Sequence, residues 1–178
     1  MGTYSLQRFD DRKLLEALSA LKTARQNGEA GPLYPWLESW RAQACAEGDA
    51  GPDDFRALYL NCVVGKPIDL LDRTPAVLAG RQADQDLRSA LLGLELGGGL
   101  ERWMREEPEE DAPDALLGLL RSADVVRLSP RVQAIAPGAI AVDPDELETY
   151  APAWEGVRRA FATAASRNEA LALVVRAV

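Results

Sequence analysis

The stretch that decides the fold is "EALALVVRA", residues 169–177, which is apolar at nearly every position. A strand with one exposed face alternates apolar and polar residues, whereas a strand that is apolar throughout suits a central position, buried on both faces. On an exposed edge the same residues would invite aggregation. We therefore predict that residues 170–176 form a central strand whose backbone is paired with neighbouring strands.

Candidate neighbours lie at the N-terminus and in the second half of the chain. "TYSLQRF", residues 3–9, alternates with the period of two that is typical of a half-buried strand. Three short β-prone pieces follow later, separated by proline and glycine: "DVVRLSP", "RVQAIAP" and "GAIAVDP". We predict one small mixed sheet of residues 3–8, strands within about 124–142, and residues 170–176, with helices over one of its faces.

Helical periodicity and capping residues predict that most of the remaining chain is helical. Asp143, followed by Pro144 and Glu146, has the spacing of a helix cap and first turn. The predicted helices are one after Asp10 or Asp11, residues 33–48, residues 51–65, short turns within 66–80, residues 82–96, residues 100–107, residues 114–123 and one from residue 144. The fold class is therefore α+β, mostly helical, in a single domain over residues 1–178.

The stretch "LELGGGLERW", residues 94–103, raises the question of a phosphate-binding loop. A P-loop requires GxxxxGK followed by serine or threonine, and a dinucleotide fingerprint requires GxGxxG after a strand. Gly97, Gly98 and Gly99 match neither pattern and follow a predicted helix. We interpret them as the end of that helix, where glycine adopts a left-handed conformation without a Cβ penalty.

The run "REEPEEDAPD", residues 105–114, holds six acidic residues and two prolines and predicts a solvated acidic loop at about 106–113. Its spacing is not that of a calcium-binding EF-hand loop, and the same holds for "DPDE" at 143–146, which a helix cap explains. We expect no metal ion and no cofactor.

The two ends of the chain resemble a known family. The pattern W-x-x-V-R-x-A-F-x-x-A-A over residues 154–165 places Trp154, Val157, Phe161 and Ala164 on one helix face, before a short turn and the final strand. Together with the opening "MGTYSL" strand and its acid-capped helix, this pattern resembles the YfbM-like family of uncharacterised bacterial domains. The resemblance implies an α+β fold and assigns no functional residue.

Charge and composition exclude several function classes. The net charge is −8, which repels the phosphates of nucleic acids and anionic lipid. The chain has no histidine, so Ser-His-Asp and Cys-His catalysis are excluded. Two cysteines are too few for a disulfide framework, and neither a signal peptide nor an apolar run of membrane-spanning length is found, which indicates a cytoplasmic protein.

We expect a non-catalytic binding or regulatory protein, in an immunity-type or adaptor role, whose acidic surface engages a partner protein with a basic surface. The alternative is a small-molecule-binding protein or an enzyme that uses carboxylates with Arg or Lys in a cleft between the helical part and the sheet. Aromatic side chains and one loop lysine are candidates for a ligand or partner face, although aromatic residues at helical spacing also suit a core. These candidates are Tyr34, Trp36, Trp40, Trp103 and Lys66.

Overall fold

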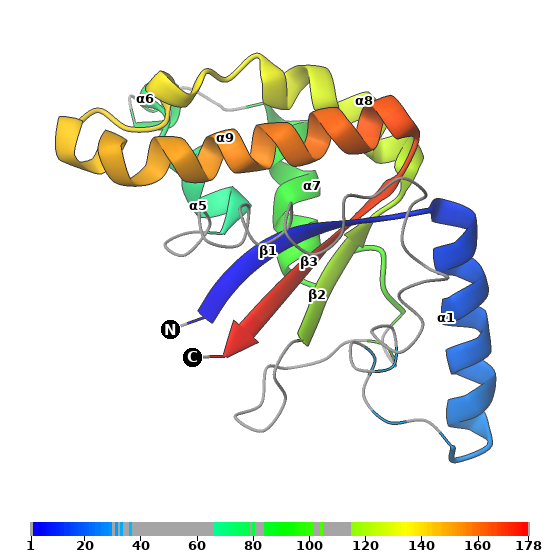
Figure 1. Ribbon diagram of the computed structural model, residues 1–178. Coiled ribbons are helices and arrows are strands. Elements are labelled where there is room, and N and C mark those ends of the chain that lie inside the picture. The colour runs from blue at the N-terminus through cyan, green and yellow to red at the C-terminus, as the bar shows by residue number, and fades with distance from the viewer. Residues whose placement is uncertain are drawn as a thin grey trace.

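Strand β3 (Ala170–Ala177) is the central strand of a three-stranded antiparallel sheet with the order β1-β3-β2 (Figure 1). The computed structural model describes residues 2–29, 31, 33, 36, 66–78, 80, 84–101, 104 and 115–177. Strand β1 (Gly2–Phe9) pairs with β3 from Gly2 opposite Ala177 to Phe9 opposite Ala170, and β2 (Ala115–Leu120) pairs with its other side. The prediction that both chain ends share one sheet, with the C-terminal strand at its centre, is confirmed.

The two faces of β3 belong to two separate hydrophobic cores. Leu171 and Leu173 pack with the helices α5 (Pro67–Asp72), α7 (Gln85–Glu95), α8 (Ser122–Gln133) and α9 (Pro144–Arg167). Ala172 and Val174 point the other way and pack with α1 (Asp11–Gln26). The expectation that helices cover one face of the sheet is therefore wrong, because α1 covers the second face, as Figure 1 shows.

The third strand lies elsewhere in the chain than predicted. Residues 124–142 form most of α8, the 3-10 helix η2 (Pro137–Ala139) and the turns around them, and β2 comes from the stretch 114–123 that was predicted as helical. Helix α8 buries Val125, Leu128, Ser129 and Val132, which is the spacing of one helix face, and it continues past Pro130. In the described residues both pairings are antiparallel, rather than the mixed arrangement expected. The α+β, mostly helical class is confirmed.

The helix boundaries follow the sequence closely. The Asp10 carboxylate caps α1 by accepting from the Lys13 N–H at 2.9 Å, and Asp143 caps α9 by accepting from the Asp145 N–H at 2.8 Å. The region 66–80 holds α5 and α6 (Pro75–Leu78), two short helices as predicted. The predicted apolar face of α9 is buried: Trp154, Val157, Phe161 and Ala164. Within the described ranges, every helix is too short or too polar to cross a lipid bilayer.

Several predictions concern residues that the structure does not describe. The acidic loop at 106–113 lies outside the described residues, as do the stretches 33–48 and 51–65, apart from Leu33 and Trp36. Of the predicted helix at 100–107, only Leu100, Glu101 and Met104 are described. The single domain over residues 1–178 stays a prediction.

Glycines bring α7 and β2 into backbone contact. Gly97 and Gly99 have φ values of 86° and 78°, and they follow the end of α7, which confirms the helix-end interpretation. The Leu119 N–H donates to the Gly98 carbonyl at 2.8 Å, so the glycine turn bonds to β2. A Cβ atom at Gly118 would overlap the Leu94 carbonyl, and one at Gly99 would overlap the Leu119 carbonyl.

We predict that Gly99→Ala destabilises the protein more than Gly28→Ala. Gly28 has a φ of 74°, close to that of Gly99, but an added Cβ atom there meets nothing within 4 Å. Gly28→Ala should cost about 1–2 kcal/mol for the left-handed backbone. Gly99→Ala should cost roughly 1–3 kcal/mol more, for the overlap with β2. Urea unfolding of both variants measures the difference, and equal losses would contradict the close packing of the turn on β2.

Candidate functional site

Two of the five residues predicted as a ligand or partner face are described, and they lie in different places. Trp36 is half-buried and packs against the core on the α1 side of the sheet. Lys66 precedes α5, and its Nζ lies 5.7 Å from the centroid of the Tyr4 ring, which packs against the opposite core. The structure therefore does not bring Trp36 and Lys66 together. Tyr34, Trp40 and Trp103 lie outside the described residues.

Next to Lys66 lies Glu95, a residue that the sequence reasoning missed. The Ile68 N–H donates to Glu95 Oε1 at 2.8 Å, so the last residue of α7 caps α5, to which Lys66 contributes no side-chain cap. Burial raises the pKa of Glu95 to about 7, and the hydrogen bond from the Ile68 N–H partly offsets this rise. The nearby charge of Asp69 raises the pKa further, whereas the charge of Lys66 lowers it. Glu95 follows the buried Leu91 by four positions and so lies on the apolar face of α7. An acid at such a position in the sequence could have indicated a partly buried carboxylate.

A groove of about 300 Å³ lies between α1 and the turn that follows α7. Its apolar lining consists of Leu15, Leu18, Met104 and Leu119. Its polar lining consists of Ser19, Lys22, Glu101 and Arg121. Lys22 Nζ and Glu101 Oε2 form an ion pair at 3.2 Å, with 46% and 57% of the two side chains exposed. Volumes of about this size lie at the lower end of the range of small-molecule sites.

At this groove Arg121 is held by a bidentate ion pair. Its Nε and Nη2 donate to the two carboxylate oxygens of Asp11 at 2.7 and 2.6 Å. The bond from Arg121 lowers the pKa of Asp11, and the same bond raises the pKa of Arg121, so both groups are charged at neutral pH. Asp11 also accepts from the Ser122 N–H at 3.3 Å. One carboxylate therefore joins the first turn of α1 to the start of α8.

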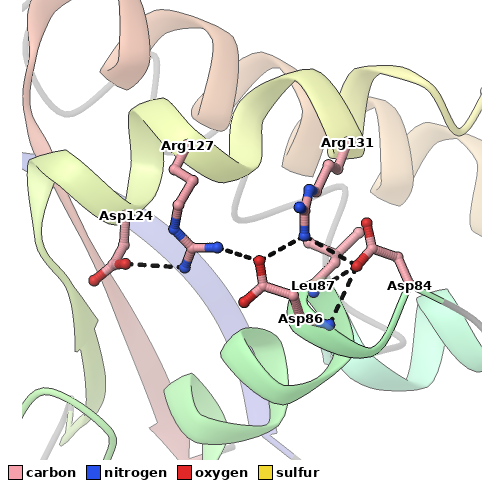
Figure 2. A network of polar contacts seen from close by, with 6 residues as sticks. All are labelled: Asp84, Asp86, Leu87, Asp124, Arg127 and Arg131. Carbon is pink, nitrogen blue, oxygen red and sulfur yellow. Dashed lines mark hydrogen bonds and ion pairs between the residues drawn. The ribbon is translucent and has the colours of Figure 1, made fainter.

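A third polar cluster connects the start of α7 to α8 (Figure 2). Arg131 Nη1 donates to Asp84 at 3.1 Å and to Asp86 at 2.5 Å. Arg127 donates to Asp124 at 3.0 Å and also to Asp86. Asp84 additionally caps α7 through the N–H groups of Asp86 and Leu87. The partners are partly exposed, so each pair contributes little, and the cluster orients α7 on α8 rather than presenting a reactive group.

Metal-binding and acid-base groups are the usual carriers of chemistry at a site. No group of three carboxylate or thiol side chains that could hold a metal ion occurs within them. The carboxyl with a pKa near neutrality, Glu95, already serves as a helix cap. The chain has no histidine to act beside it as an acid or base.

We predict that Glu95→Gln stabilises the protein at about pH 8 and not at about pH 5. The folded pKa of Glu95, about 7, exceeds its ordinary value of 4.5, so the folded state holds the proton more tightly than the unfolded chain. The stability this proton contributes is present below pH 4.5 and is lost as the pH rises through about 7. Glutamine keeps an acceptor for the Ile68 N–H and never ionises. Thermal melts against pH measure the effect, with the exposed Glu16→Gln as control; an equal difference at both pH values would contradict it.

Comparison of the chain with protein-family models, with curated proteins and with solved structures gives no match. The resemblance of its two ends to the YfbM-like family therefore stays a prediction.

Proposed function

We propose that this chain is a cytoplasmic, non-catalytic binding protein that engages a basic surface of a partner protein through acidic residues. The observation that carries the proposal is an acidic stripe on α9. The stripe consists of Asp145 and Glu148, which are exposed on one face of the helix. Glu155, further along that face, is partly buried and pairs with Arg158 at 2.7 Å. Val142, just before α9, is 67% exposed. An exposed apolar side chain bordered by charged ones matches the arrangement of an apolar interface core with a polar rim.

Helix stabilisation explains only part of this stripe. Acids in the first turn favour the positive end of the helix dipole, which accounts for Asp145 and Glu146. Glu146 also pairs with Arg73 at 3.1 Å, and Arg73 in turn stacks on the Tyr150 ring. Glu148 lies beyond the first turn and is exposed, so its charge faces solvent.

The distribution of charge along the chain supports the same function. The net charge is −8, and the segment 105–114 alone carries six acids against one arginine. Such a field accelerates encounter with a basic partner and disfavours acidic ones. Within the described residues, the basic side chains of the polar clusters are engaged by carboxylates of the same chain. Cations already paired in this way are less suited to activating a substrate, which supports a binding function over a catalytic one.

We predict that the double variant Asp145→Asn/Glu148→Gln binds its partner roughly fivefold more weakly, since each exposed pair contributes roughly 0.2–1 kcal/mol. The tagged protein is used to capture partners from native lysate at low and high salt, and captured proteins are quantified. Capture should fall with salt and with the double variant.

The matched control is Glu16→Gln/Glu29→Gln on and just after α1, which changes the net charge by the same amount at other exposed positions. Equal losses for both double variants would assign the effect to net charge and contradict the stripe on α9. Recovery of no partner at low salt would overturn the proposed function itself.

A further inference from the structure

We propose that the groove between α1 and the glycine turn binds a small zwitterion with an apolar side chain, of the class of the apolar α-amino acids. This inference goes beyond the proposed function and shares no residue with the stripe on α9. It stands on the combination of an apolar floor, one carboxylate and two cations around a volume of about 300 Å³.

The floor of the groove suits an aliphatic or aromatic side chain. Leu18, Met104 and Leu119 are buried and line the groove, and Leu15 lines it while remaining 43% exposed. Methionine adapts its shape to different apolar ligands. Small-molecule sites combine such an apolar lining with a few polar groups that set the orientation.

The polar groups of the groove match both charges of a zwitterion. Lys22 and Glu101 form an ion pair in which both side chains are exposed, and exposed ion pairs open at a small cost in free energy. Once the pair opens, Glu101 accepts from the ligand ammonium, and the ligand carboxylate takes its place beside Lys22.

Arg121 supplies a second cation whose position is fixed. Its bonds to Asp11 use Nε and Nη2, which leaves Nη1 outside that ion pair. Arginine presents several donors in one plane, so it can hold Asp11 and a ligand carboxylate together. A simple fatty carboxylate offers no hydrogen-bond donor to Glu101, and a simple amine offers no acceptor to Lys22 and Arg121.

The test is an NMR titration of the full chain with leucine, methionine and phenylalanine. We expect a Kd of about 1 mM or tighter for at least one of them. Shifts should concentrate at residues 15–22, 99–101 and 119–121. Two analogues of leucine serve as comparators: 4-methylpentanoate lacks the ammonium group, and 3-methylbutylamine lacks the carboxylate. Each should bind at least about tenfold more weakly than leucine, because one charge-assisted bond is lost.

Two test variants, each with a control variant, locate the site. Ser19→Trp places a large side chain at the polar lining and should abolish the shifts, whereas Ser89→Trp, on an exposed position of α7, should leave them unchanged. Glu101→Gln should weaken leucine binding about tenfold, with Glu16→Gln as its control. The same variant should not weaken 4-methylpentanoate binding, because it removes a competing carboxylate from Lys22. Thermal melts check that each variant is folded.

The proposal is overturned if none of the three amino acids binds, if Ser19→Trp binds them like the wild type, or if 4-methylpentanoate binds as tightly as leucine. The last outcome would make the groove a carboxylate site. None of these outcomes bears on partner capture through α9, so the two proposals fail independently.

Discussion

The antiparallel pairing of β3 with β1 and β2 is the interaction on which the rest of the structure depends. The two ends of the chain meet in this sheet, and alternate side chains of β3 enter both hydrophobic cores. At the end of the sheet where β3 begins, Arg8 and Glu169 form an ion pair at 3.1 Å, with only 6% of either side chain exposed. The Glu169 carboxylate also lies 4.0 Å from Arg167 Nη1, so two arginines face it. Apolar burial and charge pairing therefore both hold the termini together.

The position of α7 follows from its contact with β2. Gly118 allows the Leu94 backbone to approach the strand, and a register shift between Leu116 and Gly118 lets Leu116 and Leu119 face the same core. From this position α7 meets α8 through the Asp84 and Asp86 cluster and caps α5 through Glu95. The turn after α7 also forms one wall of the groove beside α1. A few close backbone contacts thus determine where the polar groups lie.

The charged residues fall into two sets with different consequences. Those around Asp11 and Glu169 are partly or fully buried and join elements of the chain. Asp145 and Glu148 on α9 face solvent, and the Lys22 and Glu101 pair beside the groove is also exposed. Exposed charges can exchange a partner within the chain for an external one at small cost. The stripe on α9 uses the exposed set alone, whereas the groove adds Arg121, whose position the Asp11 pair fixes.

The sequence by itself determined the elements whose signals are local. The caps at Asp10 and Asp143, the glycine turn after α7 and the central position of the C-terminal strand each follow from residue type and spacing. Tertiary structure decided the rest. "ALLGLL" at 115–120 is apolar enough for a buried helix or a strand, and the open edge of β3 made it a strand. Glu95 becomes a half-buried cap with a raised pKa only because α5 packs against α7. Lys66 and Trp36 were grouped by residue type, yet they contact opposite cores, since the sheet separates them. Local patterns are set by neighbours along the chain, whereas burial and pairing depend on residues that folding brings together.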